Sequence, residues 1–297
     1  MGKLGIAPQM MRATFTTGYT GVKDDFDANK IIVKEVPFPI PAADEVQIKV
    51  AASSVNPIDW KISCGALAQM MPLDMSVPLG FVCAGVVTAV GSSVTRMKVG
   101  QSVWADVIQR GPRGVTLGAY AEYVVTKESK ASLKPTNLTV AEAGSIPLAG
   151  LTAVQCLRAI DTNEGSSVLV LGGSGATGTA GIQIAKAMGA KVYTTCSTRN
   201  IEYVKSLGPD EVIDYTQQDW AVVLKDKGLD GVFDSVGEND GINRAVGVLK
   251  IGGKVSTIAG AMPKDPLPNG ITAKFIMPQW PPTTSARRTP STLRRLS

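Results

Sequence analysis

The chain has 297 residues, of which 44% are hydrophobic and 19% charged, a composition typical of a soluble globular protein of about two domains. It contains no histidine, which excludes Ser-His-Asp and Cys-His triads and every zinc site that needs a histidine ligand. The net charge is +5, but residues 278–297 hold four arginines and no acid, so the rest of the chain is nearly neutral.

The first half of the chain reads as a series of short strands. They are separated by Gly and Pro turns, and several alternate apolar and polar residues, the pattern of half-buried strands. We expect strands over residues 30–36, 45–51, 85–91, 99–105 and 118–125. The pattern indicates a compact, barrel-like antiparallel domain over residues 11–137.

The second half alternates strands with helices, which predicts a parallel, doubly wound sheet over residues 138–277. We expect five strands, at residues 167–171, 191–195, 211–215, 230–234 and 254–258. Such a sheet usually has six strands, and no clear sixth is evident, so the fold is predicted to be incomplete at its C-terminal end. Residues 278–297 are rich in Pro, Thr, Ser and Arg and are expected to form a disordered basic tail.

The four cysteines stand singly, without the C-x-x-C spacing of a zinc ribbon or a redox dithiol, so we expect no metal site. Long chains without a disulfide framework are typical of reducing compartments. The first residues lack the apolar stretch of a secretory signal, and no run of about 18–20 apolar residues predicts a membrane span. We therefore expect a cytoplasmic protein, with association with an organelle left open.

A glycine-rich loop follows the first strand of the predicted parallel sheet. Its sequence, Gly172-Gly173-Ser174-Gly175-Ala176-Thr177-Gly178, has the spacing G-x-x-G-x-x-G between a strand and a helix. Glycines there allow a tight turn and let backbone N–H groups approach a pyrophosphate at the helix N-terminus. The pattern predicts dinucleotide binding, and a purely structural turn remains the alternative.

The end of the second strand indicates which dinucleotide is bound. Sites for NAD usually place Asp or Glu there, against the ribose 2′-hydroxyl. This strand ends in Cys196-Ser197-Thr198-Arg199-Asn200, where a hydroxyl and a guanidinium replace the acid. Arginine suits a 2′-phosphate, which favours NADPH. The alternatives are that Arg199 is merely solvated and that Tyr215, at the end of the third strand, packs in the sheet instead of covering the phosphate.

At this point the sequence resembles the zinc-independent quinone oxidoreductase branch of the medium-chain dehydrogenase/reductase family, near its plant-type quinone oxidoreductase homologues. The resemblance covers about residues 12–277. Its motifs lie at residues 54–61, 78–80, 84–87, 90–91, 99–100, 118–123, 148–153 and 172–189. It implies an α/β fold in which a GroES-like substrate domain is joined to a Rossmann domain, with NADPH in the cleft.

The resemblance also implies roles for individual residues. Asn56 and Thr152 would lie beside the nicotinamide, Gly175 and Gly178 under the pyrophosphate, and Ser197, Arg199 and Tyr215 near the adenosine ribose-phosphate. Further candidate cofactor contacts are Ser174, Ala176, Thr177 and Ile258. Asp59 and Lys61 would line or support the cleft, but Asp59 as a cap of a local turn and Lys61 as a solvated side chain are the alternatives. Trp60, Tyr120 and Tyr123 are expected to be packing residues.

The implied chemistry is transfer of a hydride from NADPH to a quinone or to the β-carbon of an α,β-unsaturated carbonyl, without zinc. Asn56 and Lys61 are the candidate catalytic residues, as donors to the oxygen that gains charge. The alternative is a truncated, non-catalytic NADPH-binding paralogue that serves as a scaffold or sensor. The expected partner is the small-molecule substrate, since four scattered arginines make no nucleic-acid patch. Whether the chain forms a homodimer is left open, and the missing C-terminal strand makes a dimer less expected.

Overall fold

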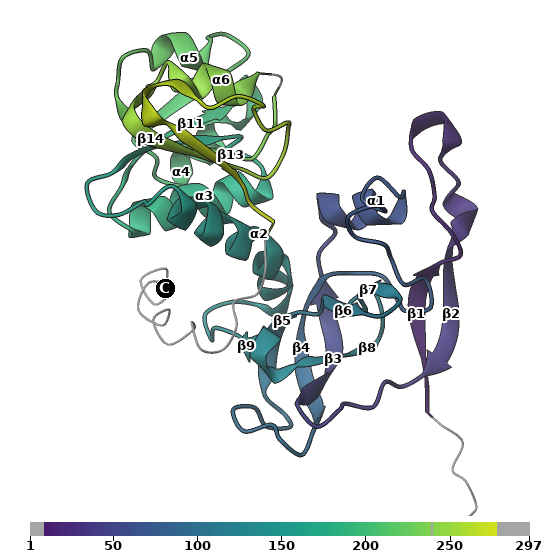
Figure 1. Cartoon of the computed structure of the whole chain (residues 1–297). Helices are drawn as coiled ribbons and strands as arrows, with labels where there is room; N and C mark the ends of the chain where they lie inside the picture. Colours follow the sequence, from purple (N-terminus) through teal and green to yellow (C-terminus); the bar gives the residue numbers. More distant parts are fainter. Residues whose placement is uncertain (1–8, 239, 278–297) are drawn as a thin grey trace, which may run out of the picture. The chain divides into compact units, whose positions relative to one another are not determined.

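The computed structural model describes residues 9–238 and 240–277 of the chain, which forms two compact units divided between Leu148 and Ala149 (Figure 1). The expected α/β fold, an antiparallel β-rich unit followed by a unit with a parallel, doubly wound sheet, is confirmed. The predicted basic tail at residues 278–297 lies outside the described residues. The predicted domain limits, 11–137 and 138–277, stay a prediction.

The first unit is built on a five-stranded antiparallel sheet in the order β8-β3-β4-β5-β9. The strands are β3 (Glu45–Ser53), β4 (Val82–Val90), β5 (Ser102–Asp106), β8 (Tyr123–Lys127) and β9 (Ala131–Leu133). Alternate residues such as Val46 and Ile48 point into its core, where they join Val87, Val103 and Val124. Register shifts in the β3–β4 pairing bend the sheet.

Shorter elements surround this sheet. Strands β1 (Met10–Thr16) and β2 (Ile31–Pro37) form an antiparallel pair whose connection contains the 3₁₀ turns η1 (Lys23–Asp25) and η2 (Ala28–Lys30). The others are α1 (Pro57–Ser63), β6 (Gln109–Gly111), β7 (Gly114–Thr116) and η3 (Glu128–Lys130). Phe15 of β1 is buried with Met11 and Ala13, which fixes the pair onto the unit through Ala121 and Tyr123.

The second unit holds a six-stranded parallel sheet in the order β12-β11-β10-β13-β14-β15. Its strands are β10 (Ser167–Leu171), β11 (Lys191–Cys196), β12 (Glu211–Asp214), β13 (Leu229–Asp234), β14 (Leu249–Thr257) and β15 (Thr272–Phe275). Its helical elements are α3 (Ala176–Ala187), η4 (Thr198–Asn200), α4 (Ile201–Ser206), α5 (Trp220–Val223), α6 (Gly241–Val246) and η5 (Pro268–Gly270), with α2 (Val140–Ala159) leading into the unit.

Helices cover both faces of this sheet, and β10 shows why its sequence is continuously apolar. Val168 and Val170 pack with residues of α2, α3 and α4, whereas Leu169 and Leu171 pack on the other face with residues of α5 and α6. In Figure 1, α3 and α4 accordingly lie on one side of the sheet and α5 and α6 on the other. A parallel strand that is buried on both faces needs no polar alternation.

The prediction that the parallel sheet has no sixth strand is wrong. Strand β15 pairs in parallel with β14, from Lys254 opposite Thr272 to Thr257 opposite Phe275. It escaped the sequence pattern because it has four residues and most of them are exposed, so it lacks the apolar run of a central strand. The sheet edge that was predicted to be bare is therefore occupied, and a missing strand gives no reason against a homodimer.

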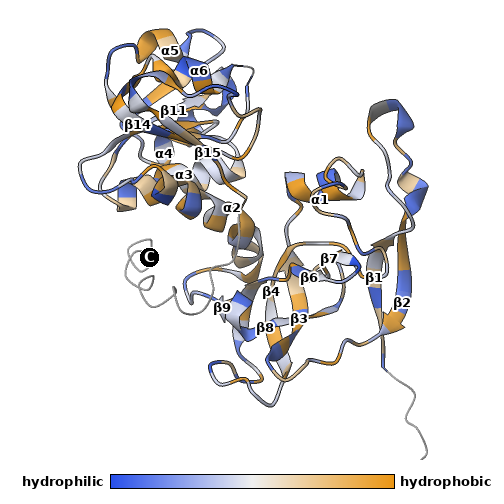
Figure 2. Cartoon of the chain, in the orientation of Figure 1, coloured by the Kyte–Doolittle hydropathy of each residue, from blue (hydrophilic) through white to orange (hydrophobic). Residues whose placement is uncertain are grey.

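Helix α2 is the element against which the prediction of no membrane span has to be checked. Within the described residues it alone is long and apolar enough to cross one by length and composition, and it is largely apolar in Figure 2. It also contains Pro147, and its residues Ala153, Cys156 and Leu157 lie in the core of the second unit. Because core helices pass the same test, α2 is weak evidence for a membrane span.

Candidate functional site

The glycine-rich loop joins the end of β10 to the start of α3, as the sequence predicts. Gly172 has a positive φ of 79°, which glycine adopts without strain. A Cβ at Gly178 would stand 2.1 Å from the carbonyl oxygen of Gly172, so the first turn of α3 packs directly on the loop. These two glycines are therefore required by the fold of the loop itself.

Gly175 is a glycine that the fold does not require. It is the N-cap of α3 with an ordinary φ of −78°, and the nearest atom to a Cβ placed there is 3.4 Å away. The N–H groups at the start of this 12-residue helix have no partner within the helix and favour an anion. The open space in front of Gly175 is thus a cradle that a side chain would fill, and it fits the pyrophosphate of a dinucleotide.

A side chain that sequence reasoning missed ties this loop to the end of β11. The amide of Asn200 donates to Ser174 Oγ at 3.1 Å and to Ser197 Oγ at 3.3 Å. It therefore brings together two of the residues proposed to contact the cofactor. No spacing rule marks Asn200 in the sequence, because its partners lie on two loops that only the parallel pairing of β10 and β11 makes neighbours.

Arg199 and Tyr215 lie at the same edge of the sheet and both are exposed. Arg199 forms no ion pair with any residue in the described part of the chain. Tyr215 keeps 57% of its surface exposed, so it does not pack inside the sheet. The carboxylate of Asp214 is turned toward Thr198, whose hydroxyl donates to it at 2.5 Å and holds its pKa below the ordinary value.

Thr152 and Ile258 are the remaining predicted cofactor contacts of the second unit. Thr152 is buried on α2. Ile258 follows β14, donates its N–H to the carbonyl of Asp234 at 3.2 Å and packs on the core formed with α2 and α3. Both predicted roles beside the cofactor stay predictions.

Asn56 is the N-cap of α1 in the first unit. Its backbone N–H donates to Asp59 Oδ2 at 2.7 Å, which is the local capping contact anticipated as the alternative role of Asp59. Its side-chain amide donates to the carbonyl oxygen and to the hydroxyl of Ser54, both at 3.1 Å. The Tyr120 hydroxyl donates to the same carbonyl at 3.2 Å, so these four residues form one polar cluster in which Asn56 and Asp59 are buried.

Burial raises the pKa of Asp59 from 3.8 to about 6, against the lowering effect of the hydrogen bond from the backbone N–H of Asn56. Its Oδ1 atom is buried without a hydrogen-bond partner among the described residues. Burial, together with the nearby Asp59, also raises the pKa of the Tyr120 hydroxyl. Tyr120 was expected to be only a packing residue, and its hydroxyl instead completes this polar cluster.

The remaining candidates on α1 are Lys61 and Trp60, which are less buried than Asp59. Lys61 is half-buried, with Nζ 5.9 Å from the centre of the Trp60 ring. Trp60 was expected to be a packing residue, and it keeps 53% of its surface exposed. The short helix turns Asp59 and Ile62 inward, which leaves Trp60 on the opposite side.

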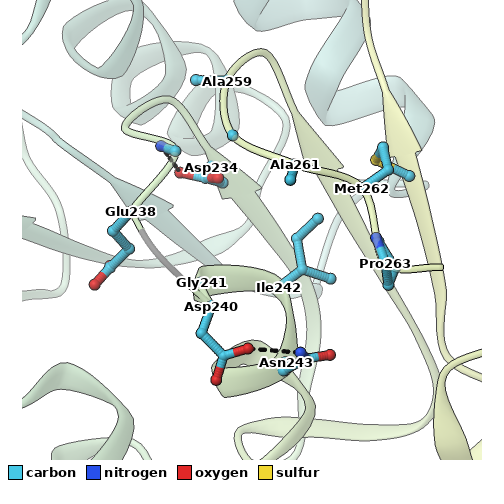
Figure 3. A pocket seen from close by; sticks show the side chains of 12 residues that line it. Asp234, Glu238, Asp240, Gly241, Ile242, Asn243, Ala259, Ala261, Met262 and Pro263 are labelled. Carbon is cyan, nitrogen blue, oxygen red and sulfur yellow. Dashed lines mark hydrogen bonds between the residues drawn. The ribbon is translucent and has the colours of Figure 1, made fainter. Parts of the chain in front are cut away.

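A pocket of about 210 Å³ lies at the carboxyl end of β13 and β14 (Figure 3). At its base Asp234 is buried and accepts hydrogen bonds from the backbone N–H groups of Val236 and Gly237, each at 2.9 Å. Glu238 and Asp240 lie along one side, and Ala261, Met262 and Pro263 along another (Figure 3). Within the described ranges no group of three His, Cys, Asp or Glu residues is placed to hold a metal ion.

Two family models match the chain. Residues 42–136 match the alcohol dehydrogenase GroES-like domain, and residues 176–281 match a model described as zinc-binding dehydrogenase. A quinone oxidoreductase of known structure from Coxiella burnetii shares 27% identity with a TM-score of 0.76, covering 97% of this chain and 86% of that one. A GroES-like unit followed by a Rossmann unit is the architecture of medium-chain dehydrogenases/reductases.

Curated relatives narrow the class. The chain is 40% identical over 261 residues to the 2-methylene-furan-3-one reductase of Solanum lycopersicum, and 40% identical over 259 residues to the chloroplastic NADPH-dependent alkenal/one oxidoreductase of Arabidopsis thaliana. Each alignment covers 86% of this chain and 64% of the relative. With the chloroplastic quinone-oxidoreductase homolog of Spinacia oleracea the chain shares 36% identity over 229 residues, which covers 75% of this chain and 67% of that one. The chain therefore belongs to the quinone oxidoreductase-like branch of the medium-chain dehydrogenase/reductase family.

Proposed function

We propose that the protein is an NADPH-dependent oxidoreductase that transfers a hydride to quinones or to the β-carbon of α,β-unsaturated carbonyls, without zinc. The observation that carries the proposal is the unforced glycine Gly175 at the N-terminus of α3, with Ser197 and Arg199 at the end of the neighbouring strand. The names of the tomato and Arabidopsis relatives support the reaction class. The absence of histidine from the sequence supports independence from zinc.

In this proposal the second unit binds the cofactor, which supplies the hydride. The N–H groups of Ala176 and Thr177 face the pyrophosphate, beside Ser174, Gly175 and Gly178. Ser197 and Arg199 bind the 2′-phosphate, because the guanidinium of Arg199 has no ion partner among the described residues and can pair with an added anion. Tyr215 covers the same phosphate, while Thr152, Ile258 and Asn56 contact the nicotinamide end.

Asn56 and Lys61 are proposed as donors to the substrate oxygen that becomes negative. The amide of Asn56 already donates to both oxygens of Ser54, so it reaches a substrate by exchanging its contact with the Ser54 hydroxyl. Lys61 pairs with no carboxylate in the part of the chain that the structure describes, so its ammonium can serve an incoming oxygen. Neither residue has to act alone, which predicts graded losses when one is replaced.

The proposed setting is a reducing compartment such as the cytoplasm, since all four cysteines are free. The Arabidopsis relative is named chloroplastic, so an organelle is the alternative that localisation would test. A homodimer is also proposed, because β15 is the last strand in the sheet and one of its edges is unpaired among the described strands. The small-molecule substrate remains the main partner.

The test is a fluorescence titration with NADPH and with NADH, followed by NADPH oxidation with a panel of quinones and enones. Arg199→Met is compared with Arg158→Met, which removes an exposed arginine from the end of α2. We expect Arg199→Met to raise the Kd for NADPH about tenfold or more, leaving NADH binding unchanged, because a charge-assisted hydrogen bond is worth about 1.5–3 kcal/mol.

Equal affinity of the unmodified chain for NADH and NADPH would contradict the proposed cofactor choice. Binding of NADPH without turnover of any acceptor would favour the non-catalytic scaffold or sensor.

A further inference from the structure

The loop that follows β13 packs directly on the glycine-rich loop. The Ser235 hydroxyl donates to the carbonyl of Leu171, the last residue of β10, at 2.7 Å. A Cβ at Gly172 would stand 2.8 Å from Val236 Cγ2, so that side chain lies on the glycine. Strands β10 and β13 are neighbours where the strand order reverses, which is the place where doubly wound sheets bind ligands.

The same loop, residues 235–238, is wedged on its other side. A Cβ at Gly237 would stand 2.5 Å from Ala259 Cβ, in the segment that follows β14. Asp234 accepts the N–H groups of Val236 and Gly237 and also accepts a hydrogen bond from the Thr257 hydroxyl at 2.9 Å. The loop 235–238 thus contacts both the glycine-rich loop and the segment that follows β14, so a displacement of the loop 235–238 would also displace the glycine-rich loop.

The far end of the loop is held by an ionic network. Trp220 Nε1 donates to Glu238 Oε1 at 2.8 Å, and Arg244 pairs with Glu238 Oε2. Arg244 also pairs with Asp219 at 2.5 Å, and its guanidinium carbon lies 4.6 Å from the centre of the Trp220 ring. Trp220 is buried, whereas the side chains of Arg244 and Glu238 are 28% and 30% exposed and that of Asp219 is 50% exposed. The ion pair of Arg244 with Glu238 is therefore less screened by water than the pair with Asp219.

The direction of the cofactor follows from the strand order. The proposed phosphate contacts Ser197 and Arg199 follow β11, on one side of β10, whereas the loop 235–238 follows β13 on the other side. A dinucleotide with its pyrophosphate over the loop after β10 would therefore carry its adenosine over β11 and its nicotinamide half over β13. The adenosine half would have no contact with the loop 235–238.

We propose that Arg244 is a positioning residue for the dinucleotide: by holding Glu238 it fixes the loop 235–238 against Gly172, where the nicotinamide half of the cofactor crosses the sheet. This inference rests on the proposed binding of NADPH. Arg244 acts through Glu238 and touches no reacting atom. Without the charge of Arg244, Glu238 and Asp219 would be two carboxylates with no cation between them.

The test compares binding of NADPH with binding of adenosine 2′,5′-bisphosphate, which contains the adenosine half alone. The variants are Arg244→Met, which keeps an apolar stem over Trp220, Glu238→Gln, which keeps an acceptor for Trp220, and the conservative Arg244→Lys. Arg158→Met is the matched control. We expect Arg244→Met and Glu238→Gln to raise the Kd for NADPH about tenfold and to leave the Kd for the bisphosphate within about twofold. Arg244→Lys should restore part of the affinity.

Equal losses for both ligands, in step with a lower Tm, would show that Arg244 only stabilises the unit and would overturn the inference. An unchanged Kd for NADPH in Arg244→Met would overturn it as well. If the unmodified chain bound the bisphosphate but not NADPH, the proposed function itself would fail, and these outcomes are distinguishable because each variant is measured with both ligands.

Discussion

Replacement of Asp59 by asparagine tests whether the buried cluster around Asn56 holds a carboxyl that prefers to be neutral. Asp59 accepts the backbone N–H of Asn56 through Oδ2, and its Oδ1 is buried without a partner among the described residues. Asparagine has nearly the same shape and can keep the contact with Asn56, but it cannot ionise. The variant therefore removes the titration and leaves the cap in place.

The magnitude follows from the pKa of Asp59, which burial raises from 3.8 to about 6. That difference corresponds to about 3 kcal/mol between the two protonation states, an upper value because solvent and relaxation reduce it. The folded chain favours the neutral carboxyl, so this stability is fully present below pH 4. It is lost as the pH rises through 6. Asp59→Asn should thus equal the unmodified chain near pH 4 and be more stable by up to ~3 kcal/mol near pH 8.

The assay is urea unfolding followed by circular dichroism at pH values from 4 to 8, together with the turnover of NADPH over the same range. Asp106→Asn is the matched control, since burial also raises the pKa of Asp106 to about 6 but it lies outside the Asn56 cluster. Both variants should flatten the pH dependence of stability, and only Asp59→Asn should alter the pH profile of turnover. A stability curve of Asp59→Asn that runs parallel to that of the unmodified chain would refute the reasoning.

Two further predictions concern the glycine-rich loop and its neighbour. Gly175→Ala should cost at most about 1 kcal/mol of stability, because Ala is a poorer N-cap than Gly but the added methyl has no atom nearer than 3.4 Å. It should nevertheless weaken NADPH binding about tenfold by filling the cradle. Gly178→Ala should cost about 1–3 kcal/mol of stability, since its Cβ meets the Gly172 carbonyl at 2.1 Å. Both variants are measured by calorimetry and by NADPH titration. A larger loss of stability in Gly175→Ala, with a larger loss of NADPH affinity in Gly178→Ala, would refute this reasoning. Asn200→Ala should raise the Kd for NADPH several-fold by releasing Ser174 from Ser197, with a loss of stability of about 1 kcal/mol, and unchanged affinity would show that the two loops are held without it.

The strands of the parallel sheet could be predicted because their chemistry is local. Helices cover both faces of β10, so residues Val168 to Leu171 form a continuous apolar run, and glycines follow where the chain turns into α3. Strand β15 could not be predicted because it lacks such an apolar run. Its four residues lie at the edge, and only one of them is even partly buried, so burial imposes no pattern on the sequence there.

In the candidate site, contacts between residues close together in the sequence could be predicted, whereas contacts between distant residues could not, because only the fold brings those residues together. The cap between Asn56 and Asp59 spans three residues and is readable as a helix start. The contact of Tyr120 with Ser54 joins residues 66 positions apart, so nothing in the sequence distinguishes Tyr120 from a packing tyrosine. The spacing of the glycines has the same limit, because it marks a loop without telling which glycine the loop needs. Gly178 is glycine because the Gly172 carbonyl leaves no room, whereas Gly175 has room for a side chain and still lacks one. Room alone does not mark a ligand site, because Gly18 and Gly247 also lack a positive φ and have no atom nearer than 3.6 Å to an added Cβ. The position of Gly175 at the N-terminus of α3 is what indicates a bound anion there.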